Sequence, residues 1–151
     1  MSNTQAMCTS FKGELLTGTH NFGTAPTRAT SAADTFKAAL YLDSATINAS
    51  TTAYTASGEV SGTGYTAGGV TVTFGTAPST SGTTAFVTPS ASITYSSVTL
   101  STAFDCVLIY NSSQSDKAVS VHTFGSQTVT AGTFTLTMPV NDASTGLIRL
   151  A

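Results

Sequence analysis

The sequence predicts an all-β protein: an antiparallel β-sandwich with one short N-terminal helix and an extended arm. Of its 151 residues, 51 are Thr or Ser, and the β-branched Thr favours the pleated, half-wet surface of a sheet. Charged residues make up only 8% and hydrophobic residues 40%, which is not the composition of a disordered chain. Short runs of alternating apolar and polar residues recur with turn residues between them, as in a sandwich or barrel. Their number suits a jelly roll, although one sequence does not give the strand order.

The N-terminal region carries the one helical pattern of the chain. Met7, Phe11 and Leu15 recur at four-residue spacing and predict an amphipathic helix over residues 4–17. Gly18 can end this helix. The residues able to cap its start are Ser2, Asn3 and Thr4. The apolar face has two interpretations: it covers an open edge of its own sandwich, or it docks on a neighbouring subunit.

Residues 18–34 are polar and include Gly23 and Pro26, and we interpret them as a connector arm. Connections this long without structure of their own are usually functional or wrap another surface. The length of the chain fits one domain. We divide it into a helix and connector arm, residues 1–34, and a β-sandwich, residues 35–151.

The first half of the sandwich is expected to contain short strands and long links. Residues 35–42 and 70–74 alternate as strands do, and residues 59–61 suggest a short edge strand. Turn-forming residues predict a link over residues 43–54 and a loop over residues 75–82.

Two further strands follow before the centre of the fold. Residues 84–88 form a short run that Pro89 stops. In residues 93–100 the apolar positions change phase at Ser96 and Ser97, which predicts a β-bulge or bend.

Residues 104–125 predict the central hairpin. Its first arm, 104–110, is apolar on both faces and is therefore expected to be covered on both sides. Its second arm, 117–124, alternates, with Ser120 and His122 on a side that meets solvent or another chain. Two last strands are predicted at residues 133–138, which Pro139 closes, and at residues 147–150.

The sequence shows no catalytic constellation. The glycine-rich SGTGYTAGG, residues 61–69, lacks the Lys-Ser/Thr of a phosphate-binding loop, and no helix follows it. Neither His20 nor His122 has a metal-ligating neighbour at short spacing, and we interpret both as surface or interface residues. The acidic residues mostly flank strands or sit in turns. We therefore predict no catalytic residue, no metal and no cofactor.

The composition also limits the partners and the compartment. Five scattered basic residues and a net charge of -2 give no footprint for nucleic acid. No apolar run predicts a membrane span or a signal peptide, so we expect synthesis in the cytoplasm. In that compartment a disulfide between Cys8 and Cys106 is not expected.

Several stretches together resemble a group of small virion structural proteins of tailed bacteriophages. They extend over nearly the whole chain, from about Ser10 to Ala151. The stretches are SFKGELLTGTHNF, DTFKAALYLDSATINASTTAYTASGEVSGTGYTAGGVTVT, LIYNSSQSDKAVSVHTFG, TAGTFTLTMP and the terminal LIRLA. None of them carries chemistry, and the family has no catalytic residues to transfer.

The resemblance implies a non-enzymatic virion protein made in the host cytoplasm. The first expectation is a capsid decoration (cement) protein on the major capsid protein, as a homo-oligomer, with the trimer of small cement proteins as a model. The alternative is a tail, neck or fibre-attachment component. A third hypothesis is a carbohydrate- or receptor-binding module that uses exposed tyrosines such as Tyr54 and Tyr65. The candidate contact residues for a subunit or partner are Met7, Phe11, Leu15, Tyr65 and His122.

Overall fold

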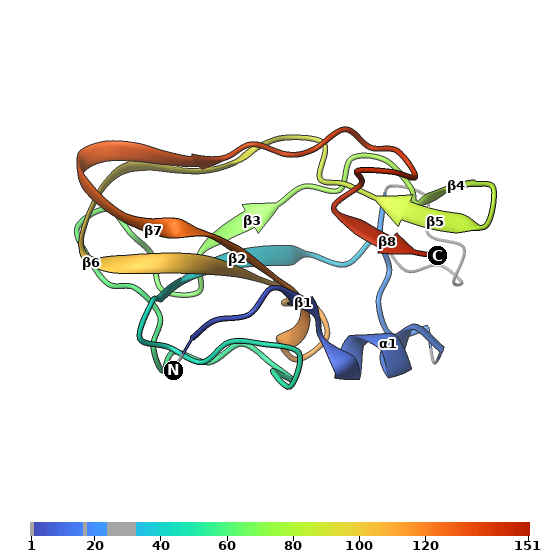
Figure 1. The fold of residues 1–151 in the computed structure, drawn as a ribbon, viewed down its shortest axis with the longest axis horizontal. Coiled ribbons are helices and arrows are strands. Elements are labelled where there is room, and N and C mark those ends of the chain that lie inside the picture. Colours follow the sequence, from blue (N-terminus) through green and yellow to red (C-terminus); the bar gives the residue numbers. More distant parts are fainter. Residues whose placement is uncertain (1, 17, 24–32) are drawn as a thin grey trace.

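The computed structural model describes residues 2–16, 18–23 and 33–151. It is almost entirely β, with two antiparallel sheets and one short helix (Figure 1). This confirms the predicted all-β class and is consistent with a β-sandwich. The sheets contain five and three strands, an arrangement that does not confirm a jelly roll.

Each sheet has a simple order. The larger sheet runs β1 (Ala6–Met7), β7 (Lys117–Leu136), β6 (Ile93–Asn111), β2 (Phe36–Leu42) and β3 (Val70–Val72). The smaller sheet runs β4 (Ser79–Ser81), β5 (Thr84–Val87) and β8 (Ile148–Leu150). The helix α1 spans Thr9–Leu16.

The β6–β7 hairpin dominates the molecule, with arms of 19 and 20 residues. The sequence predicted each arm as two separate strands, but bulges join them into one bent strand. One bulge lies between Tyr95 and Val98, where Ser97 has a φ of 54°, which confirms the predicted break in phase. The hairpin curls so that its outer half covers its inner half (Figure 1). The Tyr95 hydroxyl therefore reaches β2 and donates to the Ala38 carbonyl at 2.8 Å.

The inner half of this hairpin is the centre of the core, as predicted. Phe104, Cys106 and Leu108 on one face and Val107 and Ile109 on the other are all at most 1% exposed.

The side of β7 that carries Ser120 was expected to meet solvent or another chain. Instead, Ser120 is 3% exposed. Leu147 and Ile148 lie on the same side, around a small cavity that Ser120 also lines. The prediction of an open face here is wrong for Ser120, because Leu147 and Ile148, before and at the start of the last strand, lie beside it.

The N-terminal helix is shorter than predicted. Met7 lies in the extended β1 and pairs with Ser120 of β7, so it does not share a helix face with Phe11 and Leu15. Phe11 is 1% exposed within the hydrophobic core, so α1 packs on its own sandwich. Gly18, at a φ of 65°, ends the helix with its N–H on the Leu15 carbonyl at 3.2 Å, as predicted.

The predicted N-terminal caps are wrong. The Cys8 and Thr9 N–H groups donate to the Val119 and Ala49 carbonyls at 3.0 and 2.8 Å. The helix begins at Thr9, five or more residues beyond the predicted caps, and backbone carbonyls of neighbouring segments accept the N–H groups at its start. Asn3 instead accepts a hydrogen bond from the Ile47 N–H at 2.8 Å.

The remaining loops agree in part with the sequence. Residues 43–54 form a link without a named strand, as predicted. Residues 59–61 form no strand; Glu59 makes only an isolated bridge with Tyr41. The predicted loop over residues 75–82 contains β4, because Ser79–Ser81 pair with β5.

Candidate functional site

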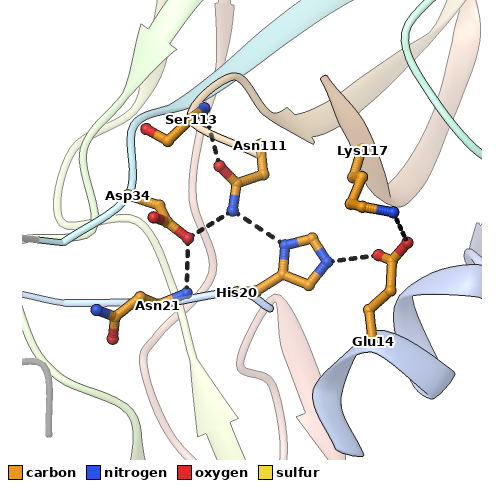
Figure 2. Close-up of polar contacts among 7 residues, drawn as sticks. All are labelled: Glu14, His20, Asn21, Asp34, Asn111, Ser113 and Lys117. Carbon is orange, nitrogen blue, oxygen red and sulfur yellow. Dashed lines mark hydrogen bonds and ion pairs between the residues drawn. The ribbon is translucent and has the colours of Figure 1, made fainter. Parts of the chain in front are cut away.

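A buried polar network joins α1, the two ends of the connector and the tip of the β6–β7 hairpin. Figure 2 shows how its residues lie. Its members are Glu14, His20, Asn21, Asp34, Asn111, Ser113 and Lys117.

His20 lies at the centre of the network, and its side chain is 0% exposed. Its Nδ1 lies 3.0 Å from the Asn111 side-chain nitrogen, and its Nε2 lies 2.6 Å from Glu14 Oε2. An amide nitrogen can only donate, so Nδ1 accepts and the ring proton on Nε2 is donated to Glu14. The tautomer of His20 is therefore set by its two partners. The predicted surface or interface position of His20 is wrong.

Asn111 is 0% exposed and uses its whole side chain. Its amide nitrogen donates to His20 and also to Asp34 Oδ2 at 2.8 Å. Its Oδ1 accepts the Ser113 N–H at 3.1 Å. Asn111 therefore fixes the positions of His20, Asp34 and Ser113 relative to one another, since leaving any of these buried groups without its hydrogen bond would cost free energy.

Asp34 and Asn21 bring the two ends of the connector together. The Asn21 N–H donates to Asp34 Oδ2 at 2.9 Å, and the Asp34 N–H donates to the Asn21 carbonyl at 3.0 Å. Gln114 at the hairpin tip adds a bond to Asp34 Oδ1 at 3.2 Å. The segment between them therefore begins and ends at one place. Most of the predicted arm, residues 24–32, lies outside the described residues.

Glu14 is one of the two carboxylates of the network, together with Asp34. Its second oxygen accepts Lys117 Nζ at 2.7 Å. Burial by itself would raise the pKa of Glu14, but the hydrogen bonds and charges of Lys117 and His20 together lower that pKa below its ordinary value.

A histidine beside a carboxylate can serve as a general base when its other ring nitrogen faces a nucleophile. In this network the other nitrogen faces the Asn111 amide. What the arrangement does in the described chain is hold α1 and both ends of the connector on the hairpin.

Glu59 organises a second polar centre with two tyrosines. It accepts the Tyr54 hydroxyl at 2.6 Å, and it accepts the Tyr65 hydroxyl and the Gly68 N–H at 2.7 Å each. Burial, followed by the bond to Glu59, raises the pKa of Tyr54 to about 12. The other three tyrosine hydroxyls donate to backbone carbonyls, so all five tyrosines are tied within the chain: Tyr41 to Thr55, Tyr95 to Ala38 and Tyr110 to Gly68.

The same centre covers the rings that were candidates for ligand binding. Tyr54 stacks on Tyr110 with ring centroids 4.9 Å apart, and Tyr65 stacks on Tyr95 at 5.9 Å. Both Tyr54 and Tyr65 are half-buried rather than exposed. The expectation that they stand free on the surface is wrong, because the loop that carries them folds onto the sheet.

The glycine-rich residues 61–69 make this close approach possible. A Cβ on Gly69 would lie 1.7 Å from the Ala38 carbonyl oxygen, and one on Gly62 would lie 2.0 Å from the Thr99 carbonyl oxygen. Only glycine lets the loop backbone lie against the strands at these points.

The remaining candidate contact residues are placed as follows. Met7 is half-buried in the edge strand β1, and Leu15 is half-buried against the core. His122 points into a cavity of about 130 Å³ that Leu136 and Met138 also line. Burial lowers the pKa of His122 to about 4, and Ser120 Oγ lies 2.9 Å from its Nε2. The structure brings the candidate contact residues together in two pairs: Met7 and His122 line one cavity, and Phe11 and Leu15 line another.

Within the described residues, no group of three His, Cys, Asp or Glu side chains could hold a metal ion, and no helix could span a membrane. Cys8 and Cys106 are both buried and free. Comparison with protein-family models, with curated proteins and with solved structures gives no match.

Proposed function

We propose that this chain is a non-enzymatic structural protein of a tailed-bacteriophage virion, and that it acts as a decoration protein on the head. In this role it binds joints between major capsid subunits and stabilises the lattice as a homo-oligomer. The resemblance of nearly the whole sequence to small virion proteins supports the proposal, with the tail or neck as the alternative location.

The observation that carries the proposal is that the acidic and histidine side chains of the polar centres bond to other parts of the chain. Glu14, His20, Asp34 and Glu59, which in another protein could perform acid–base chemistry, here hold segments of the chain together. Buried hydrogen bonds between distant segments make a structure rigid, and in this network the Asn21 side-chain nitrogen is the one buried group left without a partner among the described residues. Rigidity without chemistry is what a part of a virus shell requires.

The copy number of this chain relative to the major capsid protein, in purified particles, tests the proposal. Quantitative mass spectrometry on intact particles gives the ratio. A near-equimolar ratio supports a head decoration protein. A dozen copies or fewer would contradict that role and favour the tail or neck, and absence from the particle would contradict both.

A further inference from the structure

The outer edge of β7 changes character along its length. Near the start of the strand it is covered: the Ala118 N–H donates to the Thr52 carbonyl at 3.0 Å, and Ala6 and Met7 pair with Val121 and Ser120. Beyond Thr123 the only strand that pairs with β7, among the described residues, is β6 on the other side. Figure 1 shows this second half of β7, in red, along the rim of the molecule.

This free edge lacks the charges and prolines that often keep sheet edges apart. Natural proteins place charges, prolines or covering segments along an exposed edge strand. Here the sequence contains no Asp, Glu, Lys or Arg between Lys117 and Asp142, and no proline between Lys117 and Pro139. The stretch Phe134–Leu136 keeps a regular ladder with Ile93–Tyr95 of β6, beyond the register shift that separates it from Gly132. It therefore presents a straight, uncharged edge.

The same stretch carries apolar side chains that one copy of the chain buries only in part. Phe134, Leu136 and Met138 are half-buried on the inner side, and Thr133, Thr135 and Thr137 are exposed on the outer side. Just beyond them, Val140 is 71% exposed, more than any other large hydrophobic residue in the described chain. A strand added at this edge would extend the apolar row and shield it from water.

We propose that this edge pairs with the same edge of a second copy of the chain, antiparallel, about a two-fold axis at Thr135. In this register Phe134 lies opposite Leu136 of the partner subunit, and Thr133 lies opposite Thr137 of the partner subunit. Apolar side chains then meet apolar ones, Thr meets Thr, and no like charges oppose each other. The strand is thus complementary to itself, as an isologous two-fold contact requires.

This inference specifies how the homo-oligomer of the proposed function forms, and it rests only on the self-association in that proposal. It is tested on the isolated full chain by light scattering coupled to size-exclusion chromatography. The unmodified chain is expected to be a dimer. Thr135→Lys places two ammonium groups opposite each other at the axis and should weaken the dimer at least about tenfold, through like-charge repulsion.

Thr94→Lys is the matched control. Thr94 lies directly opposite Thr135 on β6 and is also exposed, so it receives the same charge on the neighbouring strand and leaves the free edge intact. It should remain a dimer. If both variants dissociate equally, or if the unmodified chain is a monomer or a trimer, the proposed pairing is wrong.

Cysteine cross-linking tests the register without depending on a lysine variant. The native Cys8 and Cys106 are buried, so an added surface thiol would react alone. Thr135→Cys should form a reducible dimer under mild oxidation, whereas Thr94→Cys should not. A mixture of Thr133→Cys and Thr137→Cys chains should cross-link with each other and not with themselves; any other pattern would contradict the axis.

The failure of this inference differs from failure of the proposed function. A monomeric chain that is still abundant in particles would overturn the edge pairing only. If Thr135→Lys is monomeric like the parent but no longer binds particles, the edge belongs to another particle protein, and the pairing between copies is again wrong. A dimer that is absent from particles would leave the pairing standing and overturn the virion role.

Discussion

At the residue scale, Asn111 and His122 show two ways in which a polar side chain is accommodated in this fold. Asn111 is buried with every hydrogen-bonding group of its side chain in use. His122 is held against apolar side chains, with Ser120 as its polar contact. The first arrangement stabilises through specific bonds, and the second favours the uncharged ring.

Replacement of Asn111 is expected to be costly. Asn111→Ala leaves His20 Nδ1 and an oxygen of Asp34 each without one partner in a buried site, which should lower the free energy of unfolding by about 1–3 kcal/mol. Urea unfolding measures the change. Asn141→Ala, at an exposed position, is the control and should change stability by less than about 0.5 kcal/mol. Equal effects of the two variants would contradict the role given to the network.

His122 predicts a pH dependence of stability. Its pKa falls from 6.5 to about 4 on folding, so the unfolded chain binds a proton more readily than the folded one. The stability from this residue is fully present above about pH 6.5 and is lost as the pH falls toward 4. The loss should reach about 3 kcal/mol.

His122→Leu removes this contribution, so its stability should fall less steeply than that of the parent between neutral pH and pH 4. Thermal unfolding across the range measures both curves. Parallel curves would show that His122 does not titrate as its burial implies. Glu14 adds the same pH dependence to the parent and to His122→Leu. Because folding lowers its pKa, Glu14 stabilises the fold above pH 4.5, its ordinary pKa, and this stability is lost as the pH falls through its pKa in the folded protein.

At the scale of elements, the glycine-rich residues 61–69 let a loop lie directly against the strands of the larger sheet. Gly69 has a φ of 73° and lies against the β2 backbone. Gly82 has a φ of 58°, and a Cβ added there would have no atom of another segment within 4 Å. The two sites share the backbone conformation and differ in the available space.

Gly82→Ala should therefore cost only the conformational strain, about 1–2 kcal/mol. Gly69→Ala adds a clash with the Ala38 carbonyl, so its loss of stability should exceed that of Gly82→Ala by at least about 1–3 kcal/mol. Chemical denaturation of the two variants gives the difference directly. A Gly69→Ala variant no less stable than Gly82→Ala would mean that the loop does not lie against β2.

Most strands could be predicted because one alternating run usually makes one strand. The doubly apolar run at residues 104–110 is the core strand, and the alternation of Phe134, Leu136 and Met138 matches their half-buried positions. The union of the runs into one hairpin could not be predicted, since bulges such as the one between Leu100 and Phe104 interrupt the period. The sequence did not predict β1, because a strand of two residues is too short to show an alternating pattern.

The polar network could not be predicted either. Lys117 and Glu14 are 103 positions apart, and His20 and Asn111 are 91 apart. No local spacing shows such pairs. The one signal in the sequence was that Glu14 and His20 flank the end of a helix six positions apart, which is too common to single out.

At the scale of the whole molecule, the N-terminal region belongs to the core of the sandwich. Cys8, Phe11 and Phe22 belong to the same hydrophobic cluster as the central strands, and α1 packs on β7.

Deletion of residues 1–18 should therefore unfold the monomer rather than only weaken assembly, because burial of Phe11 alone contributes about 3–5 kcal/mol. Circular dichroism and proton NMR of the truncated chain test this. A truncated chain that keeps dispersed methyl signals and fails only to associate would show that the helix belongs to a neighbouring subunit.

The closure of the connector at Asn21 and Asp34 has a practical consequence. One backbone–carboxylate bond and one backbone–carbonyl bond hold the two ends at one point. In general, each doubling of the length of a flexible loop costs only about 0.6 kcal/mol of closure entropy. A peptide inserted after Gly23, beyond the core residue Phe22, would leave the hydrogen bonds at its base intact. The chain thus offers a permissive display site whose anchor is the protein's own buried histidine network.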